Sequence, residues 1–343
     1  MERTDGVETF VGIDAHSKQC SIKAISRQGE ELKEIDVATR AVDLKKALKG
    51  LPRPVWAMVE SSYLAPLLRD LIEESVDRFI VCETRENRWI SHSEDKGDQA
   101  DADRLCRLLR MGEFKAVHVP GGLGRDRREV LRMYQKVQGD VSRTKNRIKG
   151  KYREHGVPLQ GKRVYGEVHR KECLAQVSRE QGRFLLEVLY QKLESDEERC
   201  EEVLDRLVKL MRGDARYESL KEIPGLGKVL SAVVAAVIDE PDRFATKRKL
   251  WSYAGLGVRS RWSGDPSKAK VSGSKGGNRL LKYAALMAAN AALRGENRFS
   301  RHHRKMLAEG ADPSMAKRTV ARKILATALV LMKTGAAYED DQV

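Results

Sequence analysis

The chain has 343 residues, which is enough for two domains or for one domain with long helices. Hydrophobic residues make up 41%, charged residues 34% and aromatic residues 6%, a mix that favours solvated helices over a β-rich sandwich. The net charge of +15 predicts a polyanionic partner, with nucleic acid preferred to a membrane surface. No run approaches the roughly 18 apolar residues of a membrane span, and the polar first ten residues lack a signal-peptide core. We therefore expect a soluble, cytoplasmic protein with no membrane partner.

The first eighty residues alternate between strand and helix patterns. Residues 7–40 predict three short strands separated by glycine and charged residues, as in hairpins. Buried strands are predicted at 55–60 and 78–83, and short helices at 43–49 and 64–74. An opening meander followed by alternating strands and helices is typical of an α/β sheet of mixed direction.

From about Gly97 the pattern is helical, and its first long segment is strongly basic. Residues 125–153 hold eleven Lys or Arg and three Asp or Glu. Cations of this kind contact phosphates, so part of this block is predicted to bind nucleic acid. The candidate residues are Arg143, Lys145, Arg147, Lys149 and Lys151.

A heptad pattern follows the first basic block. Apolar residues alternate by three and four positions, with one polar interruption at Asp196. The positions are Leu186, Leu189, Leu193, Asp196, Cys200, Val203, Leu207 and Leu210. The spacing predicts the seam of a coiled coil. The alternative is one amphipathic helix packed on its own domain.

The composition changes near Ile223, where IPGLGKVLSAVVAAV begins. Its Pro-Gly-x-Gly turn before an apolar helix resembles a helix-hairpin-helix turn, whose amides face a phosphate; a plain glycine turn between packed helices is the alternative. Residues 243–282 then hold eleven basic residues and one acidic residue. The candidate nucleic-acid contacts in this second block are Arg259, Arg261, Lys268, Lys270, Lys275 and Arg279.

Four acids are placed like metal ligands. Asp14 ends the first predicted strand and Glu60 ends the fourth, where side chains converge at the carboxyl edge of a sheet. Asp98 and Asp101 are three apart on a predicted helix and share a face, whereas Asp103 points elsewhere. Hard cations such as Mg²⁺ prefer oxygen ligands and serve phosphoryl transfer. A turn or cap role is the alternative for each acid alone, and His16 is interpreted as a loop residue.

A glycine-rich, basic loop leads into a small-residue helix at 253–293 and carries a candidate nucleophile. Ser263 has cations on both sides in the sequence, and a serine that attacks a phosphodiester needs such charges around the phosphate. No histidine lies near it in the sequence, which disfavours a Ser-His-Asp hydrolase. Ser260, Ser272 and Ser274 are equally plausible from the chemistry alone, and a polar loop serine is the alternative.

These motifs together resemble the DEDD-type transposases of insertion-sequence family one hundred and ten (IS110), which are bridge-RNA-guided recombinases. The resemblance is carried in order by VGIDAHSK, the glutamate of VESS, KGDQADADRL, IPGLGKVLSAVVAAV and, near the C-terminus, FATKRKLWSYAGLGVRSRWSG and SKGGNRLLKYA. It implies a RuvC/RNase H-like DEDD domain at 1–120, a basic helical and coiled-coil region at 121–217, and a mainly α C-terminal transposase domain at 218–343.

The resemblance also implies roles for single residues. Asp14, Glu60, Asp98 and Asp101 match the four acids that bind Mg²⁺, and Ser263 matches the nucleophile that forms a phosphoserine link to DNA. The implied partners are donor and target DNA, a structured bridge RNA, and further copies of the chain in a dimer or tetramer.

Two departures and two rival functions stand beside this interpretation. Gly97 replaces a larger residue at the start of the acidic helix, and Pro266 gives the loop after Ser263 its own spacing. A RuvC-like nuclease would use the carboxylates with water to cut branched DNA. A non-catalytic nucleic-acid-binding protein would need only the basic blocks.

Overall fold

The computed structural model describes residues 4–83, 98–158, 161–261, 270–273 and 276–340, with backbone alone for Asp98 and the strands 258–261 and 270–273. The chain divides into two compact units, Met1–Arg125 and Asp126–Val343. Each unit is described by itself, and the three-part division at 120 and 217 stays a prediction. No helix within the described ranges is long and apolar enough to span a bilayer.

The N-terminal unit is built on one mixed sheet of six strands in the order β3-β2-β1-β4-β5-β6. The strands are β1 Thr9–Ala15, β2 Gln19–Ser26, β3 Glu31–Ala38, β4 Val55–Glu60, β5 Arg78–Cys82 and β6 Ala116–Val117. β1, β4 and β5 are parallel neighbours, whereas β2, β3 and β6 pair antiparallel. The predicted α/β sheet of mixed direction is confirmed, and its order is consistent with a RuvC-like domain. β6 was not predicted.

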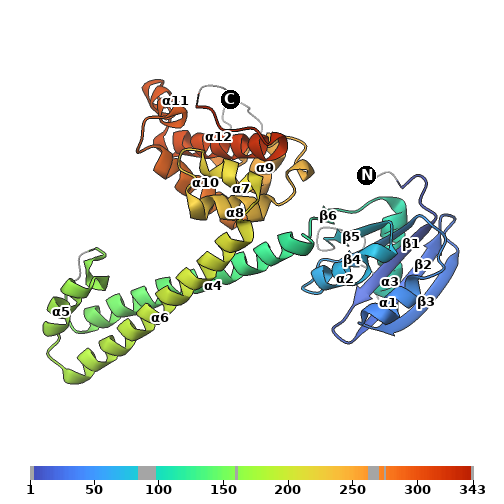
Figure 1. The fold of residues 1–343 in the computed structure, drawn as a ribbon, viewed down its shortest axis with the longest axis horizontal. Helices are drawn as coiled ribbons and strands as arrows, with labels where there is room; N and C mark the ends of the chain where they lie inside the picture. The colour runs from blue at the N-terminus through green and yellow to red at the C-terminus, as the bar shows by residue number, and fades with distance from the viewer. Residues whose placement is uncertain (1–3, 84–97, 159–160, 262–269, 274–275, 341–343) are drawn as a thin grey trace. The chain divides into compact units, whose positions relative to one another are not determined.

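Helices cover both faces of this sheet. α1 (Ala41–Leu48) and α2 (Ala65–Ile72) pack on one face, where their leucines join the apolar residues of the strands in one core cluster. α3 (Asp98–Met111) packs on the opposite face (Figure 1) and forms a second cluster with Phe10 and Met58. Since both faces are covered, β1 and β4 are apolar at nearly every position.

The C-terminal unit is mainly helical, as predicted. α4 begins at the end of the first unit and runs far into the second. The helices are α4 Gly122–Glu154, α5 Glu167–Ala175, α6 Glu180–Met211, α7 Ala215–Lys221, α8 Lys228–Ile238, α9 Lys247–Tyr253, α10 Arg279–Ala292, α11 Arg298–Ala308 and α12 Pro313–Thr334. One core joins α7 to α12 with the ends of α4 and α6 that lie near them.

α4 and α6 lie side by side as a long antiparallel pair (Figure 1). The heptad positions of α6 face α4 of the same chain: Leu186 and Leu193 are buried in a cluster with Ile148. Asp196 is buried too, and it accepts a hydrogen bond from the Thr144 hydroxyl at 2.8 Å. The predicted seam is therefore covered within the chain, which agrees with the packed-helix alternative, and a coiled coil between chains is not confirmed.

The turn before α8 is shaped by packing. Gly225 has a φ of +89°, and a Cβ there would lie 2.1 Å from the carbonyl oxygen of Ala288 in α10. Only glycine satisfies both the left-handed backbone and this close approach. The structure thus gives Gly225 the role expected in a plain glycine turn between packed helices.

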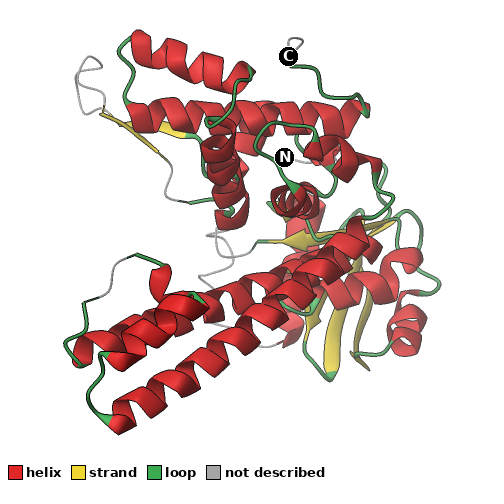
Figure 2. Cartoon of the chain, turned by 60° about the vertical axis from the view of Figure 1, so that its left-hand side comes forward, coloured by secondary structure: helices red, strands yellow, loops and turns green. Residues whose placement is uncertain are grey.

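The glycine-rich loop predicted after α9 contains a hairpin instead. β7 (Val258–Arg261) pairs antiparallel with β8 (Lys270–Gly273), as a two-stranded ribbon apart from the six-stranded sheet (Figure 2). Arg261 lies opposite Lys270 in the register. The short, polar strands have no apolar alternation, so composition alone indicated a loop. Ser263 falls between the strands, outside the described residues.

Candidate functional site

Asp14 and Glu60 lie at the same edge and on the same face of the sheet. β1 and β4 are parallel, with Gly12 opposite Met58 and Ile13 opposite Val59. Asp14 and Glu60 come one residue after the last of these pairs. Since side chains alternate between faces, both carboxylates share the face of Gly12 and Met58. The register therefore places both strand ends at one edge of the sheet, and the role of the two acids as metal ligands stays a prediction.

The other half of the site is α3, which crosses this face very closely. A Cβ built on Gly12 would lie 1.9 Å from the carbonyl oxygen of Ala102. One turn further along α3, the Cys106 thiol donates to the carbonyl of Phe10 at 2.9 Å. The helix therefore runs against the direction of β1, and its N-terminal turn lies towards Asp14. A glycine two residues before Asp14 is what permits this approach.

The first turn of α3 carries the two helical acids. Asp98 is its first residue, and its side chain is outside the described part of the structure. Asp101 is exposed and pairs with Arg104 at 2.8 Å. Asp103 pairs with Arg107 at 2.6 Å on another side of the helix, as its position predicted. Among the side chains that are described, Asp14, Glu60 and Asp101 do not form a set whose oxygens all lie within 4.8 Å.

Two further polar residues belong to this edge and escaped the sequence analysis. Across the strands, Asp14 lies opposite Ser21, and Ser21 lies opposite Asp36. The Ser21 hydroxyl donates to Asp36 at 2.6 Å, and the amide of Gln99 in α3 reaches the other Asp36 oxygen at 3.5 Å. Asp36 is thus an additional acid on the face of Asp14. Only the strand register reveals it.

His16 lies in the turn after β1, as predicted, but it also contacts the candidate site. Its Nε2 atom is 3.2 Å from an oxygen of Asp14, and its side chain is 58% exposed. The donor set at this edge is therefore dominated by carboxylate oxygens, with one imidazole beside them. Such a set fits a hard divalent cation such as Mg²⁺.

The basic candidates on α4 divide into two rows, because alternate positions on a helix face opposite sides. Arg143 and Arg147 are exposed and form one row with Lys151. The other row points back into the protein: Lys145 pairs with Glu197 at 2.6 Å, and both Lys145 and Lys149 lie over the ring of Tyr165. The block is thus only partly available to a polyanion.

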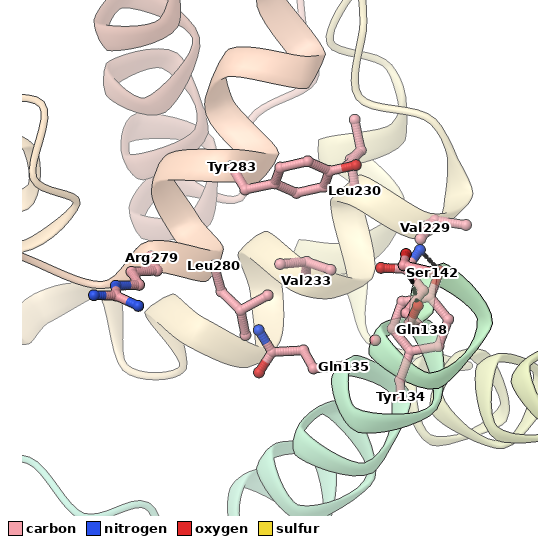
Figure 3. A pocket seen from close by; sticks show the side chains of 11 residues that line it. Tyr134, Gln135, Gln138, Ser142, Val229, Leu230, Val233, Arg279, Leu280 and Tyr283 are labelled. Atoms are coloured by element: carbon pink, nitrogen blue, oxygen red, sulfur yellow. Dashed lines mark hydrogen bonds between the residues drawn. The ribbon is translucent and has the colours of Figure 1, made fainter. Parts of the chain in front are cut away.

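Arg279 is the candidate of the second basic block whose side chain is described. It is the first residue of α10 and lines a cavity of about 440 Å³ between α4, α8 and α10 (Figure 3). Tyr134 and Tyr283 line the same cavity. Lys268 and Lys275 lie outside the described residues, as do Ser263 and Ser274. For Arg259, Arg261, Lys270, Ser260 and Ser272, the structure gives the backbone on β7 and β8.

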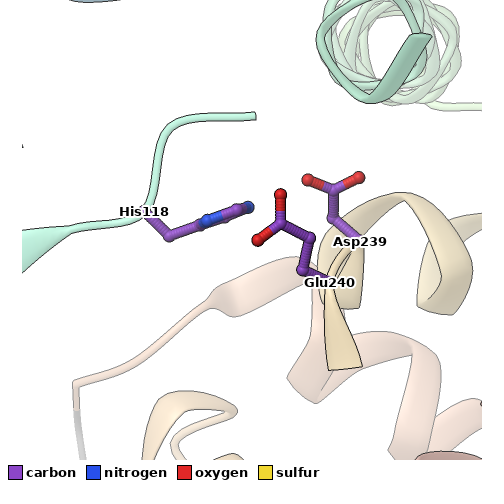
Figure 4. A group of neighbouring side chains, drawn as sticks. All are labelled: His118, Asp239 and Glu240. Atoms are coloured by element: carbon purple, nitrogen blue, oxygen red, sulfur yellow. The ribbon is translucent and has the colours of Figure 1, made fainter. Parts of the chain in front are cut away.

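A further pair of acids lies in the C-terminal unit. Asp239 and Glu240 follow α8, and their carboxylates lie within 4.8 Å of each other (Figure 4). Asp239 has a positive φ of 59° at the end of the helix, and its carbonyl accepts from Arg216 at 3.2 Å. His118, drawn in the same figure, belongs to the N-terminal unit. The two acids were not predicted.

Comparison with known families matches both units. Residues 11–155 match a DEDD model of the IS110 type, described as "Transposase". Residues 217–304 match the model described as "Transposase IS116/IS110/IS902 family". The chain carries IS110-family transposase domains. The first of them contains Asp14, Glu60, Asp98 and Asp101, and the second contains Ser263.

Two curated relatives are similar to parts of the chain. The "Insertion element IS110 uncharacterized 43.6 kDa protein" of Streptomyces coelicolor is 28% identical over 120 residues, which are 35% of this chain and 29% of the relative. The "Transposase for insertion sequence element IS1111A" of Coxiella burnetii is 23% identical over 205 residues, 58% of this chain and 56% of the relative. The chain thus spans about half the length of the second relative and less of the first.

Proposed function

We propose that this chain is an RNA-guided DNA recombinase of an insertion sequence, which cuts and rejoins donor and target DNA through a phosphoserine intermediate. The observation that carries the proposal is the close approach of α3 to β1 at Gly12, because it turns the acidic first turn of α3 towards Asp14 and Glu60. The second transposase domain then supplies Ser263.

The carboxylate edge would hold the metal. Asp14, Glu60, Asp98 and Asp101 are the proposed ligands of Mg²⁺, which would polarise a backbone phosphate of the DNA. His16 and Asp36 support the edge from outside this set: the first contacts Asp14, and the second lies in its cross-strand row. Arg104 contacts one carboxylate oxygen of Asp101, and the second oxygen would be the one that binds the cation.

Ser263 would perform the transfer. Its Oγ attacks a backbone phosphorus and loses its proton, a phosphoserine ester forms, and the leaving strand departs as a free hydroxyl. A hydroxyl of another strand then attacks the same phosphorus and releases the serine. The cations of β7 and β8 would stabilise the charge on the phosphate. Arg143, Arg147 and Lys151, which form the outer row of α4, would hold the nucleic acids together with the other candidates of the second basic block.

The guide and the assembly belong to the same proposal. A structured bridge RNA would pair with donor and target DNA, so the chain itself would need few base contacts. The formal charge of +15 suits two kinds of nucleic acid bound together. The acids and the serine would meet across subunits of a dimer or tetramer, and this assembly would form through surfaces other than the covered face of α6.

A covalent-adduct assay tests the proposal. Purified protein, Mg²⁺, RNA transcribed from the noncoding DNA beside the gene, and labelled donor DNA are run on a denaturing gel. We expect an adduct with the native chain and with Ser272→Ala, and none with Ser263→Ala. Asp14→Asn should also lose the adduct while keeping DNA affinity.

Cleavage without an adduct, at equal rates in the native chain and in Ser263→Ala, would instead establish a metal-dependent nuclease that uses water. If Ser272→Ala loses the adduct and Ser263→Ala keeps it, the nucleophile is the other serine. Binding of DNA and RNA without cleavage in any variant would favour the non-catalytic alternative.

A further inference from the structure

A cavity of about 300 Å³ in the C-terminal unit is lined by α9, α11 and α12. Lys247 and Trp251 come from α9, Arg298 comes from the start of α11, and Arg322 and Lys323 come from α12. Four of the eight described lining residues are therefore cations, and none of the eight is acidic. None of these residues is among the predicted acids, the candidate serines or the predicted basic candidates.

The fold holds this cluster firmly. The indole nitrogen of Trp251 donates to the carbonyl of Arg322 at 2.9 Å, which joins α9 to α12. The Nε atom of Arg322 donates in turn to the carbonyl of Leu256 at 2.7 Å. Leu256 lies two residues before β7, so this hydrogen bond connects the cluster to the root of the β7–β8 hairpin, which is the point where β7 begins. In the sequence, Ser263 belongs to the segment that connects the two strands.

The cations oppose one another and are partly removed from water. Burial lowers the pKa of Lys323, and the charges of Arg298 and Lys247 lower it further. Burial and the charge of Arg318 also lower the pKa of Arg322. Asp340 accepts hydrogen bonds from the backbone N–H of Arg298 and from Arg301, but it does not line the cavity. With no anion bound, this arrangement of cations lowers the free energy of unfolding.

The Arg322 guanidinium of the cluster has a buried donor without an acceptor. The Nη2 atom of Arg322 is buried and has no hydrogen-bond partner among the residues that the structure describes. Buried polar groups without a partner are rare in folded proteins and call for a ligand or water. An anion in the cavity that Arg322 lines would offer an acceptor to this guanidinium and offset the mutual repulsion of the cations.

We propose that this cavity binds a phosphate group of the nucleic-acid backbone, held by Lys247, Arg322 and Lys323 at the root of the β7–β8 hairpin. A guanidinium with a free donor and two ammonium groups match the several oxygens of a phosphate. The site would hold one nucleic-acid strand next to the residues where β7 begins. This inference rests on the nucleic-acid-binding part of the proposed function and not on its chemical steps.

The test compares two double variants with the same loss of charge. Lys247→Gln with Lys323→Gln alters the cavity. Lys249→Gln with Lys317→Gln removes two lysines of the same two helices that do not line it. Inorganic phosphate is titrated against each protein at constant ionic strength, and the melting temperature is followed. Binding to a labelled DNA duplex is then measured between low and high salt.

Phosphate should raise the melting temperature of the native chain and of the control variant, and should leave the cavity variant unchanged. The slope of log affinity against log salt should decrease by about 0.9 for each phosphate contact that the cavity variant loses, beyond the decrease in the control. Without phosphate, the cavity variant should be at least as stable as the control, because repulsion is relieved. A destabilised cavity variant would indicate a structural role and overturn the proposal.

Equal responses of the two double variants to phosphate and to salt would also overturn the proposal. If the cavity variant no longer responds to phosphate but keeps the slope of log DNA affinity against log salt, the cavity binds small anions. That result would refute its assignment to a phosphate of the nucleic-acid backbone. The adduct assay at low salt and saturating DNA separates this site from the chemistry. The cavity variant should still form the Ser263 adduct there, whereas failure of the proposed function removes the adduct from the native chain as well.

Discussion

At the scale of single residues, Gly12 determines how close the two halves of the candidate metal site come. We expect Gly12→Ala to destabilise the N-terminal unit by about 1–3 kcal/mol, because the new methyl group would meet backbone atoms of α3 that cannot rotate away. Metal-dependent cleavage should fall further than stability does, since the first turn of α3 would move from Asp14. Urea unfolding and cleavage rates at saturating Mg²⁺ measure the two effects.

The matched control is Gly150→Ala in α4, where a Cβ meets nothing within 4 Å. A helical glycine in open space should gain about 0.5–1 kcal/mol on this change. If Gly12→Ala were as well tolerated as Gly150→Ala, α3 would not be held at the distance described, and the geometric basis of the metal site would be lost.

Asp196 explains the polar interruption of the heptad pattern. Burial alone would raise the pKa of this carboxyl, but hydrogen bonds from Lys192 and Thr144 outweigh it and lower the pKa below its ordinary value. Its stabilising contribution is therefore complete above the unfolded pKa of about 3.9 and is lost as the pH falls through the lower folded pKa.

We expect Asp196→Asn to cost about 1–2 kcal/mol at pH 7, because a charge-assisted bond is lost and the half-exposed Lys192 is partly screened by solvent. The difference in the free energy of unfolding between this variant and the native chain should become smaller below pH 4. Chemical unfolding at several pH values measures it, with the exposed Glu198→Gln as the control. A difference that does not vary with pH would mean that the charge of Asp196 is not what stabilises the pair.

At the scale of secondary-structure elements, the two rows of cations on α4 should behave differently. Replacing Arg143 and Arg147 by Gln should lower the salt dependence of nucleic-acid binding, by about 0.9 per phosphate contact in duplex DNA. Replacing Lys145 and Lys149 should mainly lower stability, because these side chains contact Glu197 and Tyr165. The reverse pattern would assign the nucleic-acid surface to the second row.

Most elements of the sheet were predictable because their signals are local. VWAMVE is an apolar run of strand length and became β4 with the predicted bounds. β7 and β8 were missed because each has only four residues, of which one is a valine, and acquires strand geometry only through its partner strand. Periodicity likewise identified the buried face of α6, but it does not specify the partner, which is α4 of the same chain.

The candidate site divides in the same way. Asp14 and Glu60 were predictable because each ends a recognisable strand. Asp36 could not be predicted as part of the site. Its position near Asp14 depends on the register of three strands, and its contact with Gln99 depends on a helix that is distant in the sequence. The cation cavity depends on three helices whose contacts leave no periodic signal in the sequence.

At the scale of the whole molecule, the two units have separate cores, so their unfolding should be separable. Leu68 is fully buried in the first unit and Leu325 in the second. Each Leu→Ala change should cost about 2–5 kcal/mol and should lower only the calorimetric transition of its own unit. If both transitions moved together in either variant, the units would unfold as one cooperative body.

We expect the pairing of α4 with α6 to act as a spacer of fixed length within the C-terminal unit. The 32 residues of α6 rise by about 48 Å, close to the length of fourteen base pairs of duplex DNA. The contact between Thr144 and Asp196 fixes how the two helices are aligned. Seven residues inserted into both helices would therefore lengthen the spacer by about 10 Å and keep the same face outward, whereas five would rotate everything beyond the insertion.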